Sequence, residues 1–241
     1  MIISHKYKMV FMKAQKTGSS SVEAALYPYL GLDDVATGDQ WGPGKNMDQI
    51  GTNNQHVGIP ELIERGVFPE DYTIVSVRRN PWDREVSSFW FVAAALRKEE
   101  FNITKAAPIE EVKEKFNSYL EGIYINGNPV NHVYGQSDVY YFTPAGEPRC
   151  DIYLDFNNLD QEYQELCQQL TIPYEPLGRF NSHQRKQGLD YTHYYDKSMR
   201  DLVAAYWNRD IWFFQWQFGE DIGRKDYWTG LERPARAKLG R

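Results

Sequence analysis

The chain lacks the patterns of disulfide-rich and metal-binding proteins. It has only two cysteines, Cys150 and Cys167, and they form neither a metal-binding spacing nor a disulfide framework. We therefore expect two reduced thiols, as in a cytosolic protein. The five histidines include no ligand pair of the His-x-x-x-His kind, so the sequence does not indicate a metal site.

Long apolar runs and an excess of basic residues are also missing. No stretch approaches the ~20 apolar residues of a membrane span, and the first twelve residues have no apolar core like that of a signal peptide. We therefore expect a soluble, cytoplasmic protein without a membrane span. The formal net charge of −6 argues against a nucleic-acid partner. A small anionic ligand remains compatible with it, because a local cluster of lysine and arginine is sufficient for binding.

The residues that are present favour a folded α/β protein. Apolar runs typical of buried strands alternate with segments of helical periodicity, which indicates a central parallel sheet flanked by helices, a P-loop-like fold in three layers. We expect one domain over residues 1–222 and a polar C-terminal tail over 223–241. The predicted strands are 7–12, 72–77 and 151–156, and the predicted helices are 20–29, 60–65, 108–121, 160–170 and 198–207, with a further helix that ends near residue 96.

Residues 13–21, Lys-Ala-Gln-Lys-Thr-Gly-Ser-Ser-Ser, follow the first predicted strand and have the chemistry of a phosphate cradle. Backbone amides at a helix start attract anions, and Lys16 adds a positive charge. The segment is not a Walker A loop, because Lys16 precedes Gly18. An ordinary strand-to-helix turn is the alternative. The serines that supply hydroxyl donors and a helix cap are Ser19, Ser20 and Ser21.

A second basic cluster, residues 78–84, follows the next predicted strand and reads Arg-Arg-Asn-Pro-Trp-Asp-Arg. Its arginines could simply pair with nearby acids such as Asp83 and Glu85. However, ligands of parallel sheets bind at the carboxyl ends of the strands, and both basic clusters lie at such ends. One ligand with a phosphate at each end would use both clusters.

In this order the two motifs resemble those of the PAPS-dependent sulfotransferases, particularly the carbohydrate branch that contains heparan sulfate 2-O-sulfotransferase. PAPS is 3′-phosphoadenosine 5′-phosphosulfate. The family's 5′-phosphosulfate loop is similar to Lys16-Thr17-Gly18-Ser19-Ser20-Ser21, and its 3′-phosphate motif is similar to Arg79-Asn80-Pro81 followed by Ser87. The resemblance covers about residues 7–218 at the level of motifs.

The resemblance implies an enzyme that transfers a sulfuryl group from PAPS to a hydroxyl group of a glycan or a small-molecule alcohol, without a metal, and releases PAP, 3′-phosphoadenosine 5′-phosphate. Lys16 would stabilise the leaving 5′-phosphate. His56 would be the general base, because Gln55-His56-Val57 is similar to the family's catalytic His-Val segment. The expected donor contacts are Lys13, Lys16, Thr17, Gly18, Ser19, Ser20, Ser21, Arg79, Ser87, Asn181, Ser182, Arg185 and Lys186.

Several alternatives stay open at this point. His56 could be a loop histidine that pairs with the backbone, in which case a carboxylate of the preceding loop would be the base: Asp33, Asp34, Asp39 or Asp48. The chain could instead be a non-catalytic protein that binds PAP or another nucleotide. A P-loop-type phosphotransferase is the third possibility, but it would need the Walker pattern that the chain lacks.

Two further expectations concern regions outside the phosphate motifs. The long loops 31–55 and 122–149 are expected to shape the acceptor pocket, because long loops in compact domains are usually functional or mobile. The aromatic cluster near the C-terminus is expected to belong to the core rather than to a ligand site. It consists of Trp207, Trp212, Phe213, Phe214 and Trp216.

Overall fold

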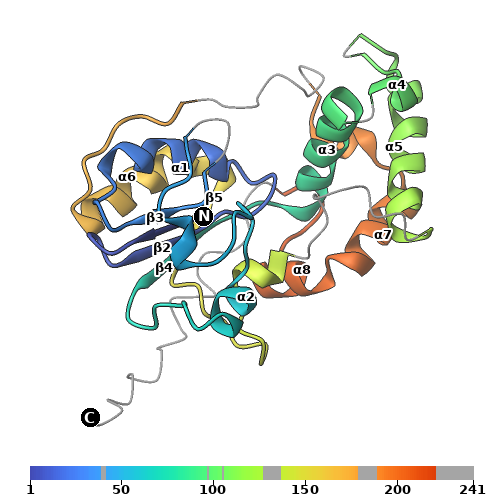
Figure 1. The fold of residues 1–241 in the computed structure, drawn as a ribbon. Coiled ribbons are helices and arrows are strands. Elements are labelled where there is room, and N and C mark those ends of the chain that lie inside the picture. The colour runs from blue at the N-terminus through green and yellow to red at the C-terminus, as the bar shows by residue number, and fades with distance from the viewer. Residues whose placement is uncertain (39–41, 97, 105, 127–136, 179–188, 221–241) are drawn as a thin grey trace.

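The computed structural model of the chain describes residues 1–38, 42–96, 98–104, 106–126, 137–178 and 189–220 (Figure 1). Its centre is a five-stranded sheet with the strand order β3-β1-β2-β4-β5. The strands are β1 (Ile2–Ser4), β2 (Met9–Met12), β3 (Val35–Ala36), β4 (Thr73–Arg78) and β5 (Ile152–Asp155).

The sheet is mixed, so the prediction of a parallel sheet is correct only for its centre. Strands β2, β4 and β5 are parallel, and Arg78 lies beside Asp155 at the carboxyl ends of β4 and β5. Strand β1 runs antiparallel to both β2 and β3. The physical reason is the four-residue connection from β1 to β2, which can join antiparallel neighbours but is far too short for a parallel crossover.

Helices cover both faces of the sheet, and each face has its own apolar core. The helices are α1 (Ser19–Leu26), α2 (Ile59–Glu64), α3 (Pro81–Phe91), α4 (Lys98–Phe101), α5 (Ile109–Tyr124), α6 (Leu159–Leu170), α7 (Lys197–Tyr206) and α8 (Asn208–Phe214). Helices α1 and α6 lie together on one face, while α2 and α8 lie on the other (Figure 1).

Side chains of strand β2 alternate between the two cores, as the strand geometry requires. Phe11 packs in the core that contains residues of α1 and α6. Val10 and Met12 pack in the larger core, which contains residues of α2, α3, α5 and α7. A strand buried on both faces is typical of the centre of an α/β sheet, which explains its nearly continuous apolar sequence.

The other predicted elements are found with small shifts. The helix expected to end near residue 96 is α3, which continues as a π-helical segment over Val92–Leu96. Both cysteines are buried free thiols, as predicted. In the aromatic cluster the prediction is wrong for Trp212, whose side chain is 66% exposed on the outer side of α8, whereas the other four members are buried. None of the described helices is long and apolar enough to cross a membrane.

Candidate functional site

The carboxyl ends of the three parallel strands meet at one edge of the sheet, and the segments that follow them touch one another. The Arg79 guanidinium, directly after β4, donates from Nη1 to the Lys16 carbonyl oxygen at 2.7 Å. The central carbon of the same guanidinium group lies 3.8 Å from the ring centroid of Phe156, which directly follows β5. The fold therefore brings the two basic segments of the sequence into contact.

The loop after β2 needs a glycine where it enters α1. Gly18 has a φ of 85°, and a Cβ atom built on it would lie 3.0 Å from Leu159 Cδ2 and 3.1 Å from Phe156 Cδ2. Lys16 also has a positive φ, of 59°. Among the described residues, the backbone amides from Lys16 to Ser20 have no hydrogen-bond acceptor. Successive amides in such a turn, at the start of a helix, form a concave site for an anion.

The hydroxyl groups of this loop are used differently from what the sequence suggests. Thr17 Oγ1 and Ser19 Oγ both donate to the Ala14 carbonyl oxygen, at 2.9 and 2.6 Å. These bonds hold the loop in shape. The prediction of a serine cap is wrong, because the N-cap of α1 is Gly18 and makes no side-chain cap hydrogen bond. Ser20 is half-buried, and Ser21 is buried.

Lys16 carries its charge in an unusual setting. Its Nζ lies 4.2 Å from the centroid of the Phe91 ring, on α3. Burial, followed by the charges of Arg79 and Arg84, lowers the pKa of Lys16 to about 7. The side-chain amine of Lys16 is therefore only partly protonated at neutral pH, and a bound anion would favour its charged form, the ammonium.

Lys13, the other lysine of the loop, is turned into the protein. Its Nζ is buried, forms an ion pair with Glu23 of α1, and donates to Gln55 Oε1 at 2.9 Å. The structure therefore does not place the Lys13 ammonium beside the Lys16 amide cradle. Instead, Lys13 connects the loop after β2 to α1 and to the segment that carries His56.

His56 is held against the loop after β2. Its Nδ1 lies 2.9 Å from the Lys13 carbonyl oxygen. A carbonyl oxygen only accepts hydrogen bonds, so Nδ1 carries the hydrogen and Nε2 keeps a lone pair. Burial is the main reason that the pKa of His56 is lowered to about 4, with the charges of Lys13 and Arg84 contributing. The imidazole is thus neutral at pH 7, the predicted backbone pairing is present, and Nε2 has no hydrogen-bond partner in the part of the chain that the structure describes.

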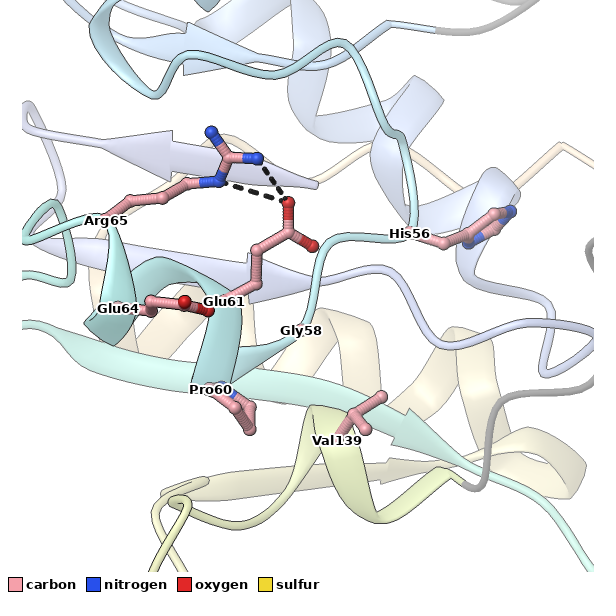
Figure 2. A pocket seen from close by; sticks show the side chains of 7 residues that line it. All are labelled: His56, Gly58, Pro60, Glu61, Glu64, Arg65 and Val139. Carbon is pink, nitrogen blue, oxygen red and sulfur yellow. Dashed lines mark hydrogen bonds and ion pairs between the residues drawn. The ribbon is translucent and has the colours of Figure 1, made fainter.

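A cavity of about 730 Å³ lies along α2 and reaches His56. Arg65 and Glu61 form an ion pair on its wall at 2.9 Å. Figure 2 shows the His56 side chain directed away from this pair, at one end of the group. Val139, from the long segment 122–149, also contributes. The full lining is His56, Gly58, Pro60, Glu61, Glu64, Arg65 and Val139.

The start of α3 positions Arg79 and Ser87. Asn80 is the N-cap and accepts a hydrogen bond from the Trp82 amide, and Pro81 occupies the first helical position. Arg79 Nε pairs with Asp83 Oδ2 at 2.6 Å, so the predicted pairing with a nearby acid is found. Ser87 follows Asp83 by four residues, and its half-buried hydroxyl has no hydrogen-bond partner among the described residues.

Sequence reasoning missed three residues of this site: Phe91, which lies under the Lys16 ammonium, Phe156, which stacks on Arg79, and Arg84. Arg84 is only 2% exposed, and its guanidinium carbon lies 4.5 Å from the ring centroid of Trp207. Its charge contributes to the lowered pKa of both Lys16 and His56. The only signal in the sequence was its membership of the basic cluster 78–84.

One reserve base does not join the described site, and five other predicted residues lie outside the part of the chain that the structure describes. Asp34, one of the reserve bases, accepts hydrogen bonds from Ser4 Oγ and from the His5 amide, both at 2.7 Å, and therefore holds a turn. The loop residues Asn181, Ser182, Arg185 and Lys186 and the reserve base Asp39 lie outside the described residues.

Within the described ranges, no group of three or more histidine, cysteine, aspartate or glutamate residues is placed to hold a metal ion. No family model matches the chain, and neither a curated protein nor a solved structure matches it.

Proposed function

We propose that this protein is a PAPS-dependent sulfotransferase with a P-loop-like three-layer fold, which transfers a sulfuryl group to a hydroxyl group of a carbohydrate or a small-molecule alcohol. The observation that carries the proposal is the 2.7 Å hydrogen bond from Arg79 to the Lys16 carbonyl. This bond supports the proposal because Arg79, our candidate for the 3′-phosphate, touches the loop that we propose for the 5′-phosphosulfate. A nucleotide with a phosphate at each end could contact both.

The 5′ end of the donor would be held by the loop after β2. The amides from Lys16 to Ser20, which lack acceptors within the described chain, would bind the phosphosulfate oxygens. The Lys16 ammonium, fully protonated beside this anion, would stabilise the negative charge that develops on the leaving 5′-phosphate oxygen. Such preorganised donors commonly supply the largest part of catalysis in group transfer.

The 3′ end of the donor would be held by Arg79 and Ser87. The Arg79 guanidinium is paired with Asp83 here, so the 3′-phosphate would compete with that carboxylate. A phosphate dianion offers Arg79 two parallel charge-assisted hydrogen bonds, which favours the exchange. Ser87 would add a hydroxyl donor, and the ring of Phe156 would keep the guanidinium in its plane.

The transfer itself would be an in-line displacement. The acceptor oxygen forms a bond to sulfur while the bond from sulfur to the 5′-phosphate oxygen breaks, and PAP leaves with the electron pair of that bond. His56 takes the acceptor proton at Nε2, because its Nδ1–H is bound to the Lys13 carbonyl. The donor's negative charge offsets the nearby lysine and arginine charges, and it would thus raise the pKa of His56 from its low value and make it a better base.

One observation favours a second function, a non-catalytic nucleotide-binding protein. The pKa of about 4 makes His56 a weak base in the free protein, and a histidine that is never needed as a base would tolerate such burial. This second function predicts that PAP binds but that no acceptor receives a sulfuryl group.

The experiment that separates these functions combines binding with transfer. Isothermal titration should show that PAP binds at least about tenfold more tightly than AMP, and that Arg79→Ala removes the difference. Arg200→Ala, a change of an exposed arginine on α7, is the matched control. Equal affinities of the wild type for PAP and AMP would rule out the proposed 3′ site. Sulfur-labelled PAPS with a panel of hydroxyl compounds then tests transfer, and ATP-dependent turnover that requires magnesium would indicate a phosphotransferase instead.

A further inference from the structure

Arg84, in the first turn of α3, is a buried cation whose Nη2 has no hydrogen-bond partner among the described residues. Its side chain is 2% exposed and forms no hydrogen bond and no ion pair with the described part of the chain. Its Nη2 is completely buried and has no acceptor there. Buried charges are normally paired, because removing an ion from water is strongly unfavourable. A buried guanidinium whose Nη2 has no acceptor among the described residues therefore points to a ligand that supplies one.

The carboxylates adjacent to Arg84 in the sequence leave its Nη2 unsatisfied, although the charges of Arg84 and the buried Glu85 attract each other. Asp83 pairs with Arg79. Glu85 accepts hydrogen bonds at Oε1 from the Tyr124 hydroxyl at 2.6 Å and from Trp207 Nε1 at 2.9 Å. The Trp207 ring packs against the guanidinium of Arg84 at 4.5 Å and offers it no acceptor in its plane. Trp207 thus orients the guanidinium without satisfying the N–H groups of its buried Nη2.

The helix geometry places Arg84 on the side of α3 that faces the proposed catalytic groups. Phe91, whose ring lies 4.2 Å from Lys16 Nζ, follows Arg84 by seven residues. Residues spaced by seven lie on the same face of a helix. The charge of Arg84 also acts on both Lys16 and His56. In the proposed reaction, the group that lies between the leaving-group lysine and the base is the sulfuryl group.

We propose that Arg84 binds the transferred sulfuryl group through Nη2–H and is a third catalytic residue, an inference that rests on the proposed function. The guanidinium would donate to a sulfuryl oxygen that carries negative charge throughout the displacement. The guanidinium would neither gain nor lose a proton in this step, because arginine stays charged in proteins. Its role would be to hold the sulfur in line between the acceptor oxygen and the 5′-phosphate oxygen.

The test compares PAPS with PAP, because PAP lacks the sulfuryl group. In Arg84→Gln we expect the affinity for PAP to stay within about threefold of the wild type, while kcat/KM with PAPS falls by about 10²–10³-fold, the usual loss for one preorganised donor. Arg84→Lys should regain part of the rate because it keeps the charge. Arg200→Gln is the matched control. A purely structural Arg84 would instead lower the affinities for PAP and PAPS equally or leave turnover unchanged, and either result would overturn the proposal.

A second measurement covers two further outcomes. Should Arg84→Gln fail to fold, the comparison of PAP with PAPS is made with Arg84→Lys, whose rate should still fall at least about tenfold. Should the wild type transfer no sulfuryl group at all, the proposed function fails, but the anion site can still be tested with inorganic sulfate. The wild type should bind sulfate at least about tenfold more tightly than Arg84→Lys. Equal sulfate affinities would overturn the assignment of Arg84.

Discussion

The two segments that follow β2 and β4 face each other but differ in how their charges are balanced. After β2, the Lys16 ammonium rests on the Phe91 ring, and the neighbouring amides have no acceptor among the described residues. After β4, the Arg79 guanidinium is already paired with Asp83 and stacked on Phe156. The first segment is prepared for an anion, whereas the second must exchange a carboxylate for one.

The same contrast appears within the loop after β2, between its two lysines. Lys13 is buried and paired with Glu23, which also pairs with the N-terminal ammonium, whereas Lys16 has positive neighbours and a lowered pKa. Burial with a partner indicates a structural cation, and burial among like charges indicates a group that waits for an anion. The comparison predicts that disturbing Lys13 affects folding and that disturbing Lys16 affects catalysis.

The largest effect is expected for Glu23→Gln. This change leaves two buried cations, the Lys13 ammonium and the N-terminal ammonium, without the carboxylate that they share. Breaking one half of a buried ion pair typically lowers the free energy of unfolding by about 3–5 kcal/mol. Urea denaturation of the variant measures the change, and Glu110→Gln on the exposed start of α5 is the control. A loss below about 1 kcal/mol, the range of exposed pairs, would contradict a structural role for Lys13.

The second largest effect is expected for Lys16→Met. The apolar side chain keeps the contact with Phe91, so stability should change little. With the proposed donor, kcat/KM should fall by about 10²–10³-fold, because the charge on the leaving oxygen loses its stabilisation. Steady-state kinetics with labelled PAPS measure this, with Lys197→Met on α7 as the control. Normal turnover in Lys16→Met would remove Lys16 from the mechanism.

Strands β2, β4 and β5 could be predicted because each has at least four residues and is rich in apolar or β-branched side chains. Strands β1 and β3 have only three and two residues, too few for a periodic pattern, and their pairing depends on contacts distant in the sequence. The prediction also treated the serines as a cap. Gly18 lets α1 begin without one in the αL conformation, and a side chain there would meet Phe156, directly after β5, and Leu159 of α6.

The sequence shows that basic residues cluster in this site, but it does not show which partner each of them has. Arg78, Arg79 and Arg84 look alike in one basic cluster. In the structure Arg78 lies in the sheet and pairs with Asp155 at 3.1 Å, Arg79 pairs with Asp83, and Arg84 has no described partner. These differences arise from which strand or helix packs against each guanidinium. No local spacing contains that information.

A smaller effect is expected for Asp83→Asn, which tests the exchange at Arg79. The neutral amide competes less well than a carboxylate for the guanidinium, so PAP should bind about three- to tenfold more tightly. AMP, which has no 3′-phosphate, should bind as it does to the wild type and serves as the internal control. Isothermal titration measures both. A weaker affinity for PAP would mean that Asp83 positions Arg79 for the phosphate and does not compete with it.

The smallest effect concerns protons taken up when PAP binds. In the free protein the pKa of Lys16 is about 7, so at pH 8 roughly nine-tenths of the molecules carry a neutral amine. A phosphate anion beside Lys16 raises this pKa, and binding at pH 8 should therefore take up close to one proton. Titrations in buffers of different ionisation enthalpy measure the uptake, which should disappear in Lys16→Met.

His56 is the other group that could take up a proton. Because its pKa is about 4, the imidazole would contribute at pH 8 only if PAP raised that pKa by several units, and His56→Gln tests for this contribution. Binding without proton uptake at pH 8 would mean that the anion does not reach the Lys16 amine. In that case the segment after β2 would not be better prepared to bind an anion than the segment after β4, contrary to what their charges suggest.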